Sequence, residues 1–271
     1  MNNREVFRFP EGVLSGKRTI MSFNILYIYD EARWERVVDM ILKYMPDSVG
    51  MQEPTPKWFH FLQENQRFSE KYVVIPYEGR EATLREGAPT LELICYRRDR
   101  YHLIEWGQKW LTDTPDVPSM VENAAMKRIL TYAVFEDKTT GEQIMHANTH
   151  IDHLREDVRY KQTKYALDFL VQYNNKPILF TGDFNTKCNS ETYALVTSSP
   201  QFSDAKKVAD WARDTFTIPS HKPIMTIDYC FVTEENIRVR TYHVCHEKIN
   251  GEFPSDHCPL FVTYDLIQGE E

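Results

Sequence analysis

The chain has 271 residues, of which 42% are hydrophobic and 27% charged, and its formal net charge is −8 at pH 7. This composition suits a soluble domain with a sizeable core, and the acidic balance argues against tight, indiscriminate binding to long nucleic acid, which needs a basic surface. No apolar run approaches the roughly 20 residues of a membrane span, the polar start of the chain is not a signal peptide, and the scattered cysteines suit free thiols. We therefore expect a cytoplasmic protein without a membrane partner, folded as a single domain over 1–271.

Apolar periodicity and turn signals predict the elements in chain order. Two capping residues mark helix starts, namely Asp30 and Thr55, the latter followed by Pro56 in the first turn. The predicted helices are 31–45, 56–65 and about 154–173. The predicted strands are 19–23, 47–51, 91–96, 101–110, 129–135, 143–147, 177–181, 227–232, 237–244 and 260–264. About ten strands and three or four helices suit an α/β fold with two mixed sheets packed face to face and helices outside.

Polar side chains gather where these strands end. In α/β sheets, ligands bind in the crevice beyond strand ends. Carboxylates suit a hard cation such as Mg²⁺ or Mn²⁺, a carboxylate base activates water, and imidazole or amide donors stabilise phosphoryl oxygens. The set therefore indicates phosphoryl hydrolysis, and a bound cation would supply the positive charge that the chain lacks. Its members are Asn24, Glu53, His150, Asp183, Asn185, Asp228, Asp256 and His257.

Six short motifs in order resemble those of the endonuclease/exonuclease/phosphatase superfamily, the DNase I-like proteins. The resemblance spans nearly the whole chain and implies a four-layer αββα sandwich and a Mg²⁺-dependent phosphohydrolase. The motifs are Ser22-Phe23-Asn24, Gln52-Glu53, Asn148-Thr149-His150, Gly182-Asp183-Phe184-Asn185, Ile227-Asp228-Tyr229 and Ser255-Asp256-His257.

The resemblance implies a role for each residue of the motifs. Glu53 is expected to be the principal metal ligand, and Asp256 a second acidic ligand or an outer-sphere partner. Asp183 is expected to be the base that orients and deprotonates the attacking water. Asn24 and Asn185 would position water, phosphate or metal.

The two histidines complete this implied machinery. His257 would donate to a non-bridging phosphoryl oxygen, and Asp228 would fix its tautomer. His150 lies where the family places a His or Tyr near the phosphate and the leaving group. The sequence disfavours a cysteine nucleophile, because Cys258, which follows His257, is itself followed by Pro259 and an apolar strand.

Further motifs are similar to those of uncharacterised bacterial members of the superfamily, namely Gly79-Arg80, Ile94-Cys95-Tyr96-Arg97-Arg98-Asp99-Arg100, Trp110-Leu111-Thr112-Asp113-Thr114-Pro115, Arg128-Ile129 and Thr149-His150-Ile151-Asp152-His153. Candidate substrate-binding residues there are Arg80, Trp110, Arg128 and His153. Arg128 could clamp phosphate or form a strand-end salt bridge, and Trp110 could line the pocket or simply pack. The chain departs from these relatives at 88–90 and 112–113. The segments 79–90, 112–125 and 214–224 are expected to wall the pocket.

The interpretation is a metal-dependent hydrolase of a phosphodiester or phosphomonoester, acting on a small molecule or a short oligonucleotide. One alternative is a nuclease on DNA or RNA that resembles abasic-site endonucleases or deadenylases. Another is a binding or scaffold protein without catalysis. The scaffold alternative is disfavoured because the base, the metal ligand and the histidine are all present.

Overall fold

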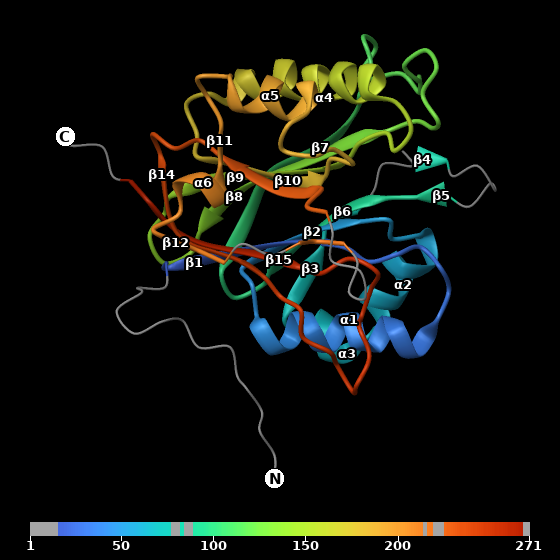
Figure 1. Cartoon of the computed structure of the whole chain (residues 1–271). Helices are drawn as coiled ribbons and strands as arrows, with labels where there is room; N and C mark the ends of the chain where they lie inside the picture. The colour runs from blue at the N-terminus through green and yellow to red at the C-terminus, as the bar shows by residue number, and fades with distance from the viewer. Residues whose placement is uncertain (1–15, 77–81, 84–88, 214–215, 219–224, 268–271) are drawn as a thin grey trace.

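A computed structural model describes residues 16–76, 82–83, 89–213, 216–218 and 225–267. Two β-sheets lie face to face, with α1–α3 outside one and α4 and α5 outside the other (Figure 1). This arrangement confirms the predicted αββα sandwich. The helices are α1 (Glu31–Tyr44), α2 (Pro56–Glu64), α3 (Gln66–Ser69), α4 (Glu156–Leu170), α5 (Glu191–Thr197) and α6 (Ala205–Val208), with a 3₁₀ turn at Val171–Tyr173.

The two large sheets are mixed, and a small third sheet lies beside them. The seven-stranded sheet has the order β12 (Trp211–Ala212), β14 (Ile237–Val244), β15 (Leu260–Leu266), β1 (Arg18–Asn24), β2 (Ser48–Gln52), β6 (Glu92–Arg97) and β3 (Tyr72–Val74). The six-stranded sheet has the order β11 (Ser203–Asp204), β13 (Asp228–Val232), β10 (Ile178–Asp183), β9 (Gln143–His150), β8 (Ile129–Asp137) and β7 (Tyr101–Trp110). The third sheet pairs β4 (Ala82–Thr83) with β5 (Pro89–Thr90).

All ten predicted strands are present, and five strands were not predicted: β3, β4, β5, β11 and β12. Each of these has only two or three residues, too few to show a period of two. The third predicted helix was too long, because α4 begins at Glu156 and its last turn tightens into the 3₁₀ turn. None of the helices in the described ranges is long and apolar enough to cross a membrane. All five cysteines are free thiols.

The helix signals in the sequence act as expected. The Asp30 side chain accepts a hydrogen bond from the Arg33 backbone N–H at the start of α1, and Thr55 does the same for Trp58 in α2. The buried face of α1 brings Trp34 against Trp58, with ring centroids 4.5 Å apart. These contacts fix both helices on the outer face of the seven-stranded sheet.

A buried polar side chain joins the two sheets. Asn148 of β9 donates to the carbonyls of Met51 (3.0 Å) and Leu93 (3.2 Å) in the opposite sheet. Its Oδ1 accepts from Gln52 Nε2 at 2.6 Å and from Thr181 Oγ1 at 3.1 Å. Both ends of the amide are therefore satisfied, which offsets the cost of burying it.

Gly50 permits this close approach. A Cβ atom on Gly50 would lie 2.5 Å from Thr181 Oγ1 and 2.6 Å from Asn148 Oδ1, well inside van der Waals contact. Any side chain here would push the sheets apart or break the hydrogen bonds of Asn148. Glycine is thus required by the spacing between the sheets, and no special backbone angle is involved.

We predict that Gly50→Ala lowers the free energy of unfolding by about 3 kcal/mol, because overpacking a filled interior costs this much. Urea unfolding followed by circular dichroism measures the change. The matched control is Gly141→Ala, where nothing lies within 4 Å of the added Cβ and only the positive φ of 74° opposes it. That control should lose about 1 kcal/mol. Equal losses in the two variants would contradict the sheet-spacing argument.

A second prediction concerns His146, which links Ser48 Oγ (2.6 Å) to Thr181 Oγ1 (2.8 Å) between the sheets. Burial lowers the pKa of His146 to about 3. The unfolded chain, with an ordinary histidine pKa near 6.5, therefore binds the proton first as the pH falls. The neutral His146 side chain therefore contributes fully to the free energy of unfolding above pH 6.5. About 2 kcal/mol of that contribution is lost at pH 5.

Urea unfolding of the wild type and of His146→Gln at pH 7 and pH 5 tests this. The variant should lose about 2 kcal/mol less than the wild type over that interval. The exposed His102→Gln serves as the control and should behave as the wild type. A His146→Gln variant with an unchanged pH dependence would refute the assignment.

Candidate functional site

The strand ends of both sheets meet at one end of the sandwich. In the six-stranded sheet, the register places His150 of β9 and Asp228 of β13 directly beside Asp183, the last residue of β10. In the seven-stranded sheet, parallel pairing of β1 and β2 sets Asn24 beside Gln52, so Glu53 follows next. The sheet registers therefore gather the residues that the sequence predicted.

Asp183 lies at the centre of this group. Its Oδ2 accepts from Asn24 Nδ2 at 3.0 Å, and its Oδ1 accepts from the Asn185 backbone N–H at 2.9 Å. His257 Nε2 lies 3.8 Å from the same Oδ2. The carboxylate is buried, and two donors fix its orientation.

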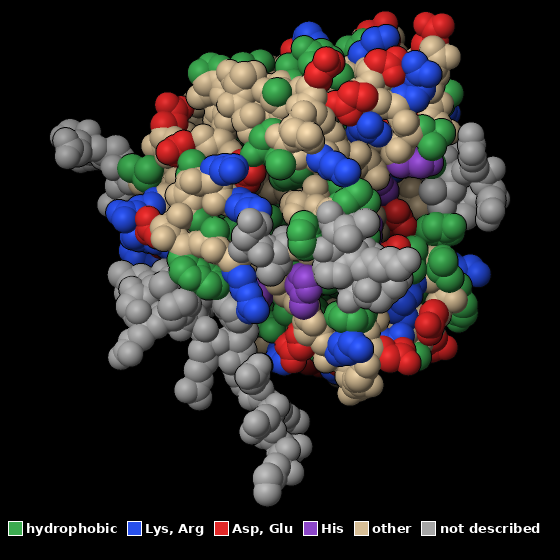
Figure 2. Space-filling model, viewed as in Figure 1, with side chains coloured by type: hydrophobic (Ala, Val, Ile, Leu, Met, Phe, Trp, Pro, Cys, Tyr) green, Lys and Arg blue, Asp and Glu red, His purple; other side chains and the backbone are tan. Residues whose placement is uncertain are grey.

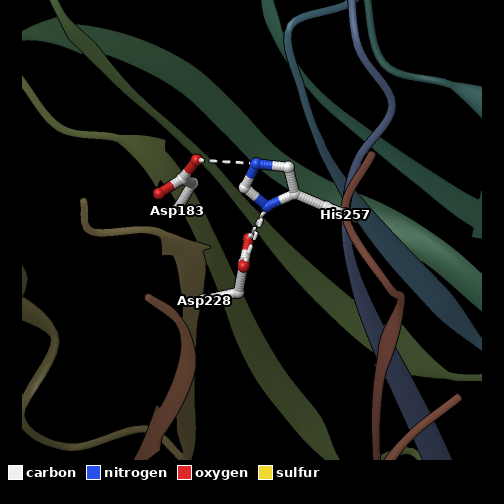
Figure 3. A group of neighbouring side chains, drawn as sticks. All are labelled: Asp183, Asp228 and His257. Atoms are coloured by element: carbon white, nitrogen blue, oxygen red, sulfur yellow. Dashed lines mark hydrogen bonds and ion pairs between the residues drawn. The ribbon is translucent and has the colours of Figure 1, made fainter. Parts of the chain in front are cut away.

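His257 forms a hydrogen-bonded pair with Asp228, at 2.9 Å between Nδ1 and Oδ2 (Figure 3). Figure 3 shows the imidazole between the two carboxylates, with one nitrogen facing Asp183 and the other facing Asp228. Asp183, Asp228 and His257 each bring one ligand atom within 4.8 Å of the others. Because Nδ1 is engaged by Asp228, Nε2 is the nitrogen left for the reacting group.

Burial and charge shift the pKa values in this group. Burial, with the nearby Asp228 carboxylate, raises the pKa of Asp183 to about 7 although the His257 cation opposes it. Burial lowers the pKa of His257, but Asp228 and Asp183 outweigh it and raise that pKa to about 10. His257 is therefore a cation at neutral pH, while Asp183 is poised to gain or lose a proton.

His150 faces Asn185 and Asp183 through its Nε2 atom. The Asn185 Nδ2 group donates to the Ile151 carbonyl (3.0 Å) and lies 2.9 Å from His150 Nε2. The same Nε2 lies 3.4 Å from Asp183 Oδ2, so the Asn185 amide favours a proton on Nδ1 whereas the Asp183 carboxylate favours one on Nε2. Burial, Arg128 and His257 all lower the pKa of His150. Nδ1 has no hydrogen-bond partner among the described residues.

Glu53 presents a carboxylate to the opposite side of the site. Its Oε1 accepts from Asn24 Nδ2 at 3.2 Å, and its Oε2 accepts from the Tyr27 backbone N–H at 3.2 Å. Asn24 thus links Glu53 to Asp183. The backbone of Glu53 has φ 69° and that of Asn185 has φ 47°, both in the left-handed region, a strain often found at functional sites.

The donor set fits a hard divalent cation. Glu53 lines the cavity and keeps lone pairs beyond its two hydrogen bonds, as an oxygen ligand of Mg²⁺ requires. Asp256 is exposed, accepts from Ser255 Oγ at 3.2 Å, and does not line the cavity. Burial lowers the pKa of Arg33, and the carboxylates of Asp30, Asp256 and Glu53 oppose this shift.

The residues of the site open into a cavity of about 320 Å³. Figure 2 shows acidic and histidine side chains in a recess on the right of the view, between the helical layers. The cavity is lined by Tyr27, Glu53, Met126, Arg128, His150, His153, Asp183, Asn185, Ile218, Ile227 and His257. This volume lies at the lower end of the range for small-molecule sites.

The four candidate substrate residues differ in their placement. Arg128 is buried with one side on the cavity, and His153 is exposed on its wall. Trp110 is buried, does not line the cavity, and has Lys127 Nζ 5.6 Å from its ring centroid. Arg80 lies outside the described residues.

Several residues of the site were not found by sequence reasoning. The cavity walls include Tyr27 and Met126, which no sequence motif singled out. Glu92 is also buried near the site, and it did offer a signal, since it is an acidic residue inside an apolar strand. Among the described residues, the predicted wall segment 214–224 contributes Ile218 to the cavity wall. Met126, also in the cavity wall, directly follows the predicted segment 112–125.

Comparison with known proteins agrees with this geometry. A protein of the endonuclease/exonuclease/phosphatase family from Bacteroides vulgatus is 28% identical, over 92% of this chain and 99% of that chain, with a TM-score of 0.79. A mannosyl-6-phosphatase from Bacteroides thetaiotaomicron is 25% identical, over 92% and 99%, with a TM-score of 0.78. The human nocturnin catalytic domain, 20% identical over 92% and 94% with a TM-score of 0.72, shares the fold.

No curated protein matches the sequence. The sequence model described as the endonuclease/exonuclease/phosphatase family matches residues 21–257, which include all the strand-end residues described above. The chain belongs to the endonuclease/exonuclease/phosphatase family.

Proposed function

We propose that this protein is a metal-dependent phosphohydrolase acting on a phosphate ester of a small soluble molecule. The observation that carries the proposal is the position of Asp183. It lies between the His257–Asp228 pair and the Asn24-linked Glu53, at the floor of one cavity. A base, a cationic donor and a metal-binding carboxylate thus face one small volume.

Asp183 is the proposed general base. Its carboxylate would accept a proton from the attacking water, and its hydrogen bonds from Asn24 and Asn185 hold it in one orientation. A pKa of about 7 makes it a stronger base than an ordinary aspartate while leaving much of it ionised at neutral pH. Its burial also keeps bulk water away from the carboxylate.

The histidines are the proposed donors to the phosphoryl group. His257 would donate from Nε2 to a non-bridging oxygen, and Asp228 holds its charge and tautomer. Neutral His150 would donate from Nδ1, which makes no hydrogen bond with the described residues and lies 3.9 Å from Glu53 Oε1. Arg128 would add a second positive charge from the cavity wall.

Glu53 would hold Mg²⁺ or Mn²⁺, with Asp256 as a second ligand or an outer-sphere partner. When bound, such a cation neutralises charge on the phosphoryl oxygens. Because the chain has a formal net charge of −8, such a cation would also favour the approach of an anionic substrate.

We predict that Asp183→Asn lowers kcat about 10³-fold, because the amide cannot accept the proton of water. His257→Gln should lower kcat about 10²-fold through the lost charged donor. Steady-state kinetics with thermal unfolding as a folding check measure both effects. The exposed Asp168→Asn is the control and should match the wild type. Near-normal turnover in both site variants would contradict the mechanism.

We also predict that EDTA abolishes activity and that Mg²⁺ or Mn²⁺ restores it. Glu53→Gln should raise the metal concentration for half-maximal activity at least about tenfold, because a charged oxygen ligand is lost. Calorimetric titration with Mn²⁺ checks binding without turnover. Full activity in EDTA, or unchanged Mn²⁺ affinity in Glu53→Gln, would remove Glu53 from the metal site.

A metal-supplemented screen tests the substrate class. It should include sugar phosphates such as mannose 6-phosphate, cyclic and linear dinucleotides, single-stranded RNA and DNA, and abasic duplex. We expect the small esters to be hydrolysed fastest, since the cavity is small and the chain acidic. Preference for a polymer would favour the nuclease alternative, and no hydrolysis of any member would favour a scaffold.

A further inference from the structure

Arg33 is a buried cation of α1 that contacts the loop between β1 and this helix. Only 6% of its surface is exposed, and it does not line the cavity. Its guanidinium donates to the backbone carbonyls of Ile25, Leu26 and Ile28, at 2.9 Å for Leu26. A buried charge is costly unless hydrogen bonds satisfy it, and here backbone oxygens accept those bonds. Arg33 therefore fixes the path of the loop 25–28.

The loop in turn donates two backbone N–H groups to the site. The Leu26 N–H donates to Asn24 Oδ1 at 3.1 Å, and the Tyr27 N–H donates to Glu53 Oε2 at 3.2 Å. Because Oδ1 of Asn24 is engaged by the loop, its Nδ2 group faces Glu53 and donates to Oε1 at 3.2 Å. The loop thus holds one oxygen of Glu53 directly and the other through the Asn24 amide.

The backbone of this loop is strained and needs a restraint from outside. Leu26 has φ 59°, a left-handed conformation that a leucine rarely adopts. Such a residue persists only where its surroundings over-determine its conformation. Arg33 supplies the restraint, because it binds the carbonyl of Leu26 and also those of Ile25 and Ile28 on either side. The rigid planar fork of a guanidinium suits several acceptors at once, which a lysine ammonium does not match.

We propose that Arg33 is a positioning residue for the metal side of the site. Its guanidinium fixes the loop 25–28, and the loop fixes the Glu53 carboxylate in the orientation that binds a divalent cation. The inference rests on the proposed function, in which Glu53 is a metal ligand. Arg33 itself lies outside the cavity and acts through the loop and Asn24.

Two other roles for Arg33 predict different results. If Arg33 serves only the fold, its replacement lowers the melting temperature but leaves the Mn²⁺ affinity of the folded protein unchanged. If Arg33 acts by its charge, it repels the metal, so Arg33→Met would bind Mn²⁺ more tightly, while Arg33→Lys would match the wild type. Positioning by the guanidinium fork predicts weaker binding in both variants.

Calorimetric titration of the full chain with Mn²⁺ distinguishes these roles, at a temperature where circular dichroism shows each variant folded. Arg33→Lys should raise the Mn²⁺ Kd about tenfold, an effect typical of losing a residue that supports a metal ligand. Arg33→Met should also raise the Kd, and Arg33→Lys, which keeps the charge, decides the matter if Arg33→Met does not fold. The control is Arg36→Lys on the same helix, whose guanidinium lies 3.1 Å from the exposed Glu252 carboxylate. It should match the wild type.

A double-mutant cycle links the effect to Glu53. Glu53→Gln removes most of what the orientation of this side chain contributes, so adding Arg33→Lys to it should change the Mn²⁺ Kd by less than about twofold. Kinetics on the best small ester give a second measurement. The Mn²⁺ concentration for half-maximal activity should rise about tenfold in Arg33→Lys, while kcat at saturating Mn²⁺ falls by less.

The outcomes separate this inference from the proposed function. An unchanged Kd in Arg33→Lys, tighter binding in Arg33→Met, or an equal effect of Arg33→Lys with and without Glu53→Gln would overturn the positioning role even in an active enzyme. Absence of Mn²⁺ binding by the wild type would also overturn it. Mn²⁺ binding that weakens in the expected pattern, but without turnover of any ester, would support the role of Arg33 and reject the proposed hydrolase.

Discussion

The close contact between the two sheets is the constraint on which the rest of the structure depends. Asn148 reaches across to Met51 and Leu93, and Gly50 leaves room for it to do so. Hydrogen bonds are directional, so this contact fixes the relative position of the sheets more strictly than apolar packing alone. Half of the site lies on each sheet, and a shift between them would misplace it.

That division explains the role of Asn24. Asn24 belongs to the seven-stranded sheet, yet its amide contacts both Glu53 in its own sheet and Asp183 in the other. The proposed metal side and the proposed base are thereby held in one geometry before any ligand arrives. Such preorganisation is what a charge-stabilising site requires, because reorganisation during the reaction would raise the barrier.

Many residues of the proposed site could be predicted from the sequence, and the physical reasons can be named. Asp183 and His257 could be placed because each ends or precedes an apolar strand, and strand ends meet at one edge. Trp110 could not be placed, because an aromatic side chain has the same appearance in a core and in a pocket. Tyr27 could not be predicted either, because it reaches the cavity from a loop. The path of that loop depends on buried Arg33, which donates to the carbonyls of Ile25 and Leu26.

Glu92 illustrates a second limit on prediction from the sequence. The physical cause of that limit lies in the packing of two sheets. A strand pattern shows which residues are buried, but it does not show what faces them from a second sheet. Burial raises the pKa of Glu92 to about 8, and the group that most opposes this is Arg128, which immediately precedes β8 of the other sheet. An acid that burial keeps largely protonated at neutral pH needs no ion pair inside the sandwich, and a strand pattern alone gives no sign of that state.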